Sequence, residues 1–293
     1  MKKIISILAL IVVIIALLGV NGVLVYNAVT AKTQEIKNPV LSLEVENHGT
    51  VKIELYPEYA PNTVKNIIAL ANNGYYNGKV FYGMDDIAVY VGRNENGETD
   101  KPTIGDIDKS VIKEENKTET STENVEQNNV TTPEVVTNPD DYEYEIDGEF
   151  VANNFKQNTL KHKKGVVSLV RADYTKQLSN LVDQSFNSGS SQFTIVMEDN
   201  NGLNGMYAGF GKVIEGMDIV EKIYALEIKP EETTEENQTE NSADSIKPFA
   251  VAPKITNATV ETYGVNYELP ETHEAFDYSS YLQTLLNQYY TTE

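Results

Sequence analysis

Short stretches of alternating apolar and polar residues predict a protein built mainly of β-strands. Apolar side chains alternate over residues 41–45 and, after an Asn-His-Gly turn, again over 51–55. Two alternating segments joined by a short turn are typical of a β-hairpin. Further short runs rich in β-forming residues, each bounded by Gly, Asn or Pro, lie at 165–170, 192–197, 210–214 and 254–262. This pattern favours a sandwich or a closed barrel.

Two segments have the spacing of amphipathic helices. In the first, Pro61 suits the first helical turn, apolar residues share one face as far as Ala71, and Gly74 suits the helix end. The second covers about residues 217–225, where apolar side chains again recur at helical spacing. We expect this second helix to cover an open end of the sheet or barrel.

Residues 4–26 form an almost wholly aliphatic stretch near the N-terminus. At about 1.5 Å per residue, a helix of this length spans the roughly 30 Å hydrocarbon core of a bilayer. Lys2 and Lys3 precede the stretch, so the positive-inside tendency places the N-terminus in the cytoplasm. We predict that residues 1–30 form a cytoplasmic tip and a single-pass anchor in the lipid bilayer of the cell membrane.

The same stretch has an alternative interpretation as a signal peptide. Val29, Thr30 and Ala31 resemble a small-residue cleavage site, and cleavage near Ala31 would release a secreted protein. The apolar stretch is longer than the usual core of a signal peptide, which favours the uncleaved anchor. In both interpretations the domain after this stretch lies outside the cytoplasm.

Composition excludes several classes of function. The 293 residues include no cysteine, which excludes a disulfide framework, a cysteine nucleophile and a lipid anchor on cysteine. The formal charge of −21 makes nucleic-acid binding improbable, because phosphates need a basic surface. The three histidines are scattered without the spacing of metal ligands, so we expect no metal site and no cofactor.

The negative charge is concentrated in three segments. Residues 106–149 hold 14 acidic and 3 basic side chains, residues 227–244 hold 7 and 1, and residues 268–293 hold 5 and none. The sequence from Asn94 to Asp141 also lacks aromatic residues, a composition typical of segments that cannot bury enough apolar surface to fold. Solvated loops explain this charge better than an acidic, cation-binding surface does.

These patterns predict the organisation of the chain. After a linker at 31–39, one domain spans 40–265 and contains disordered acidic insertions at about 94–141 and 227–246. Residues 266–293 form a tail in which apolar side chains from Tyr281 to Tyr289 recur at helical spacing. We expect a short amphipathic helix that packs on the barrel, rather than a motif that binds a partner.

The order of several motifs resembles that of the cyclophilin-type peptidyl-prolyl isomerases. One matching motif begins Val51-Lys-Ile-Glu-Leu-Tyr-Pro, and another is Ser191-Gln-Phe. The matching segments cover most of the domain outside the insertions and lie at 51–66, 74–81, 148–150, 160–168, 187–193, 203–218 and 258–264. The resemblance implies a mainly β fold: a closed eight-stranded antiparallel barrel capped by two helices.

The resemblance also implies a function, the cis–trans isomerisation of X-Pro bonds. Proline-containing polypeptides would be the partners, and the protein would act as a monomer in the folding of exported proteins. In the family an arginine donates the catalytic hydrogen bond, glutamines hold the peptide backbone, and apolar side chains line the proline pocket. The substrate-binding positions then fall on Phe81, Tyr82, Ala88, Val89, Val91, Val170, Gln192, Phe193, Thr194, Leu203 and Tyr207.

Several of these positions depart from the family pattern. Gly83 stands at the position of the catalytic arginine. Ala88, Val89 and Val91 replace a pocket aromatic, a methionine and a glutamine, and Thr194 replaces a second aromatic. Loss of one preorganised donor alone reduces rates by about 100- to 1000-fold. The alternative function is therefore a catalytically degenerate module that binds peptide or protein at the membrane surface.

Three further residues have open interpretations. The chain contains two arginines, and Arg171 is a possible substitute for the lost donor, or an ordinary surface arginine on a loop. Gln192 either grips the ligand backbone or only satisfies the strand in which it lies. The carboxylate pair of Asp85 and Asp86 is expected to form a solvated turn rather than to act as a general acid.

Overall fold

A computed structural model of the chain describes residues 37–96, 101–111, 141–230 and 246–291. The chain divides into two units, Met1–Lys37 and Asn38–Glu293, and the second unit contains all the strands of the sheet. The predicted anchor at 4–26, the cleavage site at Ala31 and most of both insertions lie outside the described residues. Within the described ranges, no helix has the length and apolar character needed to cross a bilayer.

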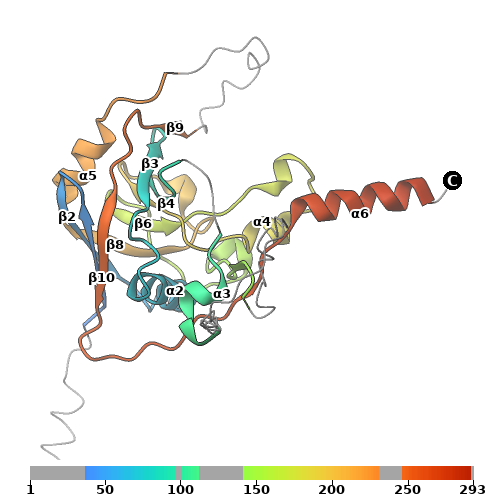
Figure 1. Ribbon diagram of the computed structural model, residues 1–293, viewed down its shortest axis with the longest axis horizontal. Helices are drawn as coiled ribbons and strands as arrows, with labels where there is room; N and C mark the ends of the chain where they lie inside the picture. Colours follow the sequence, from blue (N-terminus) through green and yellow to red (C-terminus); the bar gives the residue numbers. More distant parts are fainter. Residues whose placement is uncertain (1–36, 97–100, 112–140, 231–245, 292–293) are drawn as a thin grey trace, which may run out of the picture. The chain divides into compact units, whose positions relative to one another are not determined.

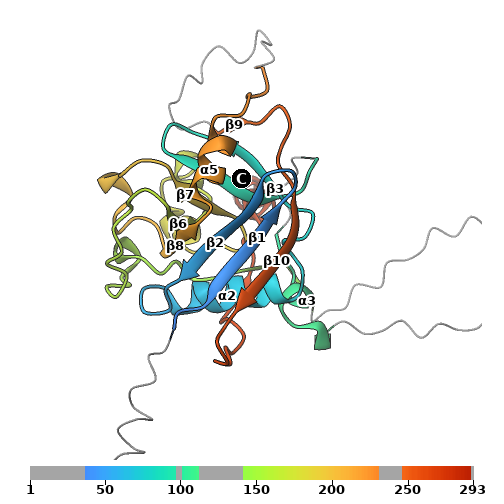
Figure 2. The ribbon, with the colours of Figure 1, turned by 90° about the vertical axis from the view of Figure 1, so that its left-hand side faces the viewer.

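The centre of the domain is one antiparallel sheet of nine strands of unequal length (Figures 1 and 2). The strands lie in the order β10-β1-β2-β8-β6-β7-β4-β3-β9. Their bounds are β1 Val40–Val45, β2 Gly49–Leu55, β3 Val80–Met84, β4 Ala88–Arg93, β6 Val166–Leu169, β7 Phe193–Val196, β8 Gly209–Glu215, β9 Lys247–Pro248 and β10 Ile255–Glu261.

The ladder differs from the expected closed barrel of eight strands. In the described part of the chain, no ladder joins β10 to β3, and an isolated bridge between Val80 and Lys254 connects the two sides. Next to it, the amide of Phe81 donates to the carbonyl of Pro253 at 2.9 Å. The short strand β9 pairs with the other end of β3. Residues 247–254 thus occupy the outer edge of β3, which leaves β10 no ladder position there.

The alternating pattern of β1 and β2 explains the packing of the core. Leu41 lies opposite Ile53 and Leu43 opposite Val51, and all four side chains are fully buried. Successive side chains of a strand point to opposite faces, so the intervening polar residues remain closer to solvent. Figure 2 shows β10, β1 and β2 side by side on one wall of the domain. The hairpin expected from the sequence is present.

Two helices lie at opposite ends of the sheet in both ribbon views (Figures 1 and 2). Helix α2 spans Pro61–Asn72 and begins with the expected proline, and its face through Val64, Ile67 and Ile68 is buried. Helix α5 spans Met217–Tyr224 and buries Val220 and Ile223. Periodicity therefore located both helices correctly.

The first insertion is partly folded, which corrects the expectation of disorder over its whole length. Residues Ile104–Ile107 form the short helix α3, followed by the 3-10 turn η1 at Lys109–Val111. Ile107 is buried, and its carbonyl accepts a hydrogen bond from the Asn73 side chain at 2.8 Å. The strand β5, Tyr144–Glu145, then pairs with β11, His273–Glu274. The burial of Ile107 and its hydrogen bond with Asn73 thus attach this part of the insertion to the end of α2.

The C-terminal tail contains the expected helix, α6 at Tyr278–Thr291, but it does not pack along the sheet. Its start is held by aromatic contacts, including stacking of Tyr278 on Tyr174 with ring centroids 5.7 Å apart. The later residues Leu286 and Tyr289 are 57% and 68% exposed. Figure 1 shows α6 extending away from the sheet. The expectation that its apolar residues cover the barrel is therefore wrong.

Short helical turns complete the described fold and lie in the loops between the strands of the sheet. Their bounds are η2 Val151–Asn153, η3 Tyr174–Lys176, α4 Val182–Phe186 and η4 Asn201–Leu203.

Candidate functional site

A groove of about 330 Å³ lies over the strands β4, β6 and β7 and the loops that follow them. One rung of the sheet forms its floor, because Thr194 of β7 lies opposite both Ser168 of β6 and Tyr90 of β4. The groove is lined by Asp85, Ile87, Ala88, Tyr90, Ser168, Leu169, Val170, Arg171, Asp173, Lys176, Thr194, Leu203, Tyr207 and Ile246. Charged, polar and apolar side chains thus share one concave surface, as ligand sites commonly do.

Six of the residues predicted from the sequence meet in this groove. They come from four separate segments, which only the sheet order brings together. They are Ala88, Val170, Arg171, Thr194, Leu203 and Tyr207.

Four other predicted residues belong to the core instead. Phe81, Val89, Val91 and Phe193 are fully buried and do not line the groove. The Phe193 ring packs in the interior with its centroid 5.8 Å from that of Tyr76. The alternation of strands explains this placement, because the neighbours of groove residues on β4 and β7 point to the opposite face.

Tyr82 and Gln192 lie outside the groove in a cluster around Arg93. The Arg93 guanidinium lies over the Tyr82 ring at 4.2 Å, and its Nε donates to Gln192 Oε1 at 3.2 Å. Burial raises the pKa of Tyr82 to about 12, against the opposing effect of the Arg93 charge. The Gln192 amide oxygen is therefore engaged by a neighbouring side chain.

Gly83, at the position of the family's arginine, has no room for a side chain. A Cβ atom built there would lie 2.6 Å from the Lys247 carbonyl oxygen and 2.9 Å from Ile246 Cγ2. Real Cβ atoms do not approach backbone this closely. The residues around β9 therefore cover this position, and Ile246 itself lines the groove.

Arg171 lies in the groove within an aromatic surround. Its guanidinium carbon is 4.8 Å from the ring centroid of Tyr207, 5.0 Å from that of Phe186 and 5.6 Å from that of Phe150. Such contacts orient a guanidinium by attraction to the ring faces. Its Nε is buried and has no hydrogen-bond partner among the described residues. A donor is thus held in the groove wall with hydrogen-bonding capacity unused.

Asp85 is not part of a solvated turn, which corrects the expectation for this residue. Its side chain is buried and accepts hydrogen bonds from the amides of Ile87 and Ala88 at 2.8 and 2.7 Å. Its other oxygen accepts from the Tyr90 hydroxyl at 2.7 Å, and burial together with this bond raises the pKa of Tyr90 well above its usual range. Asp86 is exposed and pairs with Lys247 at 2.8 Å, as a turn residue can.

A buried histidine, His162, supports the groove floor through Ser168. The sequence did not reveal this role, because the histidines were considered only as metal ligands. His162 Nδ1 lies 3.2 Å from Asn204 Oδ1, and Nε2 lies 2.7 Å from Ser168 Oγ. An amide oxygen only accepts, so the bonding pattern assigns the proton to Nδ1, and the Ser168 hydroxyl donates to Nε2. Burial lowers the pKa of His162, which keeps the ring neutral near pH 7.

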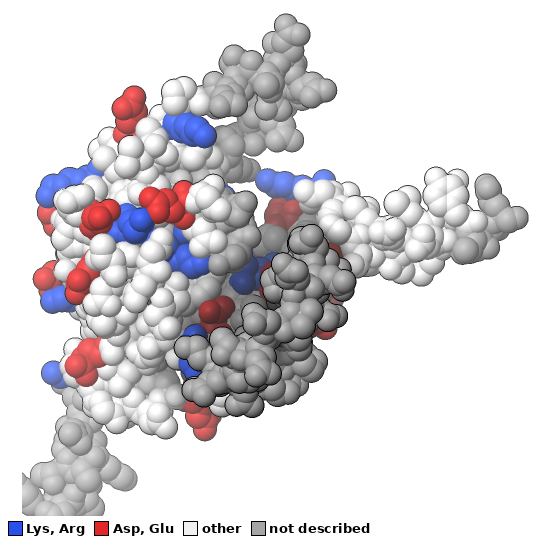
Figure 3. All heavy atoms as spheres, in the orientation of Figure 1, with Lys and Arg blue, Asp and Glu red and all other residues white. Residues whose placement is uncertain are grey.

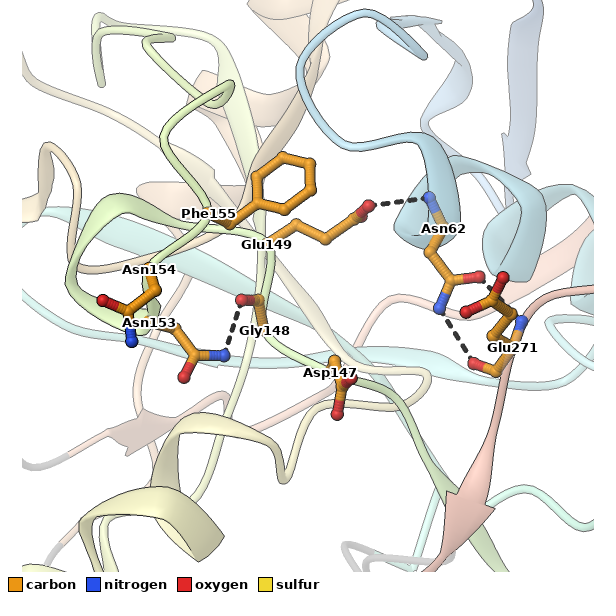
Figure 4. Close-up of a pocket in the computed structure, with 8 residues that line it drawn as sticks. All are labelled: Asn62, Asp147, Gly148, Glu149, Asn153, Asn154, Phe155 and Glu271. Atoms are coloured by element: carbon orange, nitrogen blue, oxygen red, sulfur yellow. Dashed lines mark hydrogen bonds between the residues drawn. The ribbon is translucent and has the colours of Figure 1, made fainter.

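A second depression, of about 260 Å³, lies beside the start of α2 (Figure 4). The Glu149 carboxylate points at the helix and accepts from the amides of Asn62 and Thr63 at 2.9 and 2.7 Å. The Asn62 side chain in turn exchanges two hydrogen bonds with the backbone of Glu271. These polar groups satisfy one another, so this depression stabilises the helix start and is a weaker candidate for a ligand site.

Taken together, the fold and the groove define a mainly β protein with a groove of about 330 Å³ on one face of a curled antiparallel sheet. Residues 40–245 match the family described as "Cyclophilin type peptidyl-prolyl cis-trans isomerase/CLD". This match covers more than half of the chain, so the chain belongs to the cyclophilin-type peptidyl-prolyl isomerase family.

Individual relatives have the same family assignment. A peptidyl-prolyl cis-trans isomerase of Acinetobacter baylyi is 26% identical over 183 residues, which are 60% of this chain and 68% of that protein. A probable isomerase of Brucella suis is 28% identical over 194 residues, 66% of this chain and 75% of that protein. Peptidyl-prolyl cis-trans isomerase B of Escherichia coli is 26% identical over 186 residues, which are 60% of this chain and 79% of that protein.

A solved structure is also similar. The crystal structure of a cyclophilin-type isomerase of Cryptosporidium parvum, determined in the presence of the dipeptide Ala-Pro, has 19% sequence identity and a TM-score of 0.48. The similarity covers 76% of this chain and 98% of that one.

In the described part of the chain, no group of three or more His, Asp or Glu side chains could hold a metal ion.

Proposed function

We propose that this protein catalyses cis–trans isomerisation of X-Pro bonds in exported polypeptides, which it binds in the groove. The observation that carries the proposal is the position of Arg171, which lines the groove together with Thr194, Leu203 and Tyr207. Family membership supports the reaction class. In this proposal Arg171 takes the place of the hydrogen-bond donor that Gly83 cannot supply.

The reaction requires no covalent step. Rotation of the prolyl amide must overcome a barrier of about 18–20 kcal/mol that comes from the partial double bond of the peptide. A hydrogen bond to the amide nitrogen is stronger in the twisted state, in which that nitrogen is more basic, and it lowers the barrier selectively. In our proposal Arg171 donates this bond, while the apolar side chains of Ala88, Val170 and Leu203 hold the proline ring.

We propose further that residues 4–26 tether the domain to the outer face of the cell membrane, where exported chains emerge. The support is the length and apolar character of this segment and the two lysines before it. A monomer suffices for the proposed activity, because the groove is formed within a single chain.

Exchange spectroscopy by NMR on an Ala-Pro tetrapeptide tests the catalytic proposal with the full chain in mild detergent. We expect the protein to accelerate exchange above the uncatalysed rate and Arg171→Ala to reduce the added rate by about 100-fold. Arg93→Lys is the matched control, since Arg93 lies outside the groove, and it should leave exchange unchanged. An accelerated rate that persists in Arg171→Ala would remove Arg171 from the mechanism.

A second function is favoured by one specific observation. The backbone of Lys247 fills the space beside Gly83, so the donor position of the family is blocked. A groove without a productive donor would bind extended peptide but not accelerate rotation. Peptide titration that shows saturable chemical-shift changes, together with an exchange rate equal to the uncatalysed one, would establish this binding module in place of the isomerase.

A further inference from the structure

The groove is lined by four charged side chains whose charges are not equally satisfied. Both carboxylates have internal donors. Asp85 accepts from two backbone amides and the Tyr90 hydroxyl, and Asp173 accepts from the amide and hydroxyl of Thr175. These hydrogen bonds use both carboxylate oxygens of Asp85 and one of the two oxygens of Asp173.

The two cations of the groove are in the opposite situation. Across the described ranges, neither Arg171 nor Lys176 has a carboxylate within ion-pair distance, unlike, for example, Lys101 with Glu145 and Lys247 with Asp86. Lys176 is exposed at the end of η3, and Arg171 has a buried Nε without a hydrogen-bond partner. The groove thus presents unpaired positive charge in a protein whose formal charge is −21.

We propose that the groove selects proline segments in which an acidic residue stands next to the proline, with its carboxylate bound by Arg171 and Lys176. This inference rests on the proposed function and adds the class of substrate. A carboxylate can accept two parallel hydrogen bonds from a guanidinium, which its neutral amide analogue cannot match. The aromatic rings around Arg171 fix the guanidinium, so less conformational entropy is lost on binding.

The preference for an acidic peptide has to come from the charges that line the groove, and not from the net charge of the protein. The whole protein repels an anionic peptide at long range, since its acidic residues outnumber its basic ones by 44 to 23. A charge-assisted hydrogen bond at a partly solvated site corresponds to about a tenfold difference in dissociation constant between a Glu peptide and a Gln peptide.

Peptide titration on the full chain in mild detergent tests the inference. The probes are Ala-Glu-Pro-Phe and Ala-Pro-Glu-Phe with blocked ends, each beside its isosteric Gln analogue. We expect the Glu form to bind about tenfold more tightly in at least one of the two positions. Lys176→Glu should remove or reverse this preference, and Lys156→Glu, an exposed lysine outside the groove lining, should leave it unchanged.

The outcomes separate the two proposals. If Glu and Gln peptides bind equally in both positions and exchange is still accelerated, acidic selection is overturned and the isomerase proposal stands. If none of the four peptides binds, the proposed function itself fails. A preference that survives unchanged in both Lys176→Glu and Arg171→Gln, with both variants folded by circular dichroism, would also overturn the assignment of these two residues.

Discussion

Gly83 illustrates how one position controls the geometry of the candidate site. Its neighbours in β9 approach so closely that any Cβ atom would meet the Lys247 carbonyl at 2.6 Å. We therefore predict that Gly83→Arg, which restores the family residue, destabilises the protein by about 1–3 kcal/mol or more, because β9 must be displaced. Urea denaturation measures this change. A variant with native stability and faster prolyl exchange would show that β9 yields easily and that the donor position is usable.

His162 provides a second prediction at the residue scale, concerning pH. Burial lowers its pKa in the folded protein below the ordinary value of 6.5, so the unfolded chain binds more protons once the pH falls through that value. Stability contributed by the neutral ring is therefore complete above about pH 6.5 and declines as the pH falls below it. We predict that His162→Gln shows a smaller loss of unfolding free energy between about pH 6.5 and 5.5 than the wild type.

Urea titrations of both proteins at several pH values check this prediction. His162→Gln should be less stable at neutral pH, since it alters the bonds to Ser168 and Asn204, so the informative quantity is the slope with pH. Equal slopes would mean that the ring is not held neutral by burial.

The residues of the groove were only partly predictable from the sequence. Thr194, Leu203 and Tyr207 could be located through their place in family motifs, since short collinear motifs keep their position in the fold. Asp85 was misjudged, because its burial depends on the Tyr90 hydroxyl and on two amides that close a local turn. Asp side chains commonly accept hydrogen bonds from backbone amides two residues further on, and this tendency was the signal for the turn at Asp85.

At the scale of elements, the start of helix α2 depends on a carboxylate from a distant segment. The N-cap residue Ala60 has no side-chain cap, and Glu149 accepts from the amides of Asn62 and Thr63 instead (Figure 4). A carboxylate at a helix N-terminus stabilises it through hydrogen bonds and the helix dipole. We predict that Glu149→Gln lowers the free energy of unfolding by about 1–2 kcal/mol, measured by urea denaturation.

Glu271 offers a matched control in the same depression. Its contacts with Asn62 use only its backbone amide and carbonyl, and its side chain is exposed. Glu271→Gln should therefore change stability by less than about 0.5 kcal/mol. Equal losses in the two variants would indicate a general effect of negative charge in this region rather than a specific cap.

Elements whose identity depends on local periodicity were predictable, whereas those set by distant partners were not. The hairpin of β1 and β2 and the helices α2 and α5 follow directly from apolar spacing. The strand β9 has two residues and exists because it pairs with the edge of β3. Helix α3 lies in a polar, acidic segment, and the burial of Ile107 against the rest of the domain could not be inferred from composition.

At the scale of the whole molecule, the net charge describes the insertions and the tail more than the folded domain. Figure 3 shows acidic and basic side chains interspersed over the described face, with an uncharged surface along α6. Surface ion pairs such as Lys52–Glu215 contribute little to stability, so the charge pattern mainly influences solubility and association. The two cations of the groove have no ion pair with a described carboxylate and lie on one concave surface, which makes electrostatic selection of ligands a local property.

The proposed attachment to the membrane leads to the last prediction, which concerns the full chain. Residues 4–26 are long enough to span a bilayer, and a lysine at the centre of such a helix costs about 2.5–3.5 kcal/mol for insertion. We predict that the chain, expressed with a C-terminal tag in a bacterial host, stays in the membrane fraction after alkaline carbonate extraction. Val13→Lys combined with Ile15→Lys should move it to the soluble fraction.

An N-terminal tag on the same chain separates anchoring from cleavage. An uncleaved anchor keeps both tags on one membrane-bound species, and protease added outside spheroplasts digests the domain, because the two N-terminal lysines favour retention of that end in the cytoplasm. Loss of the N-terminal tag together with release of the domain into the medium would instead establish cleavage near Ala31. In that event isomerisation would no longer be confined to chains emerging at the membrane, and the groove would act on secreted clients in solution.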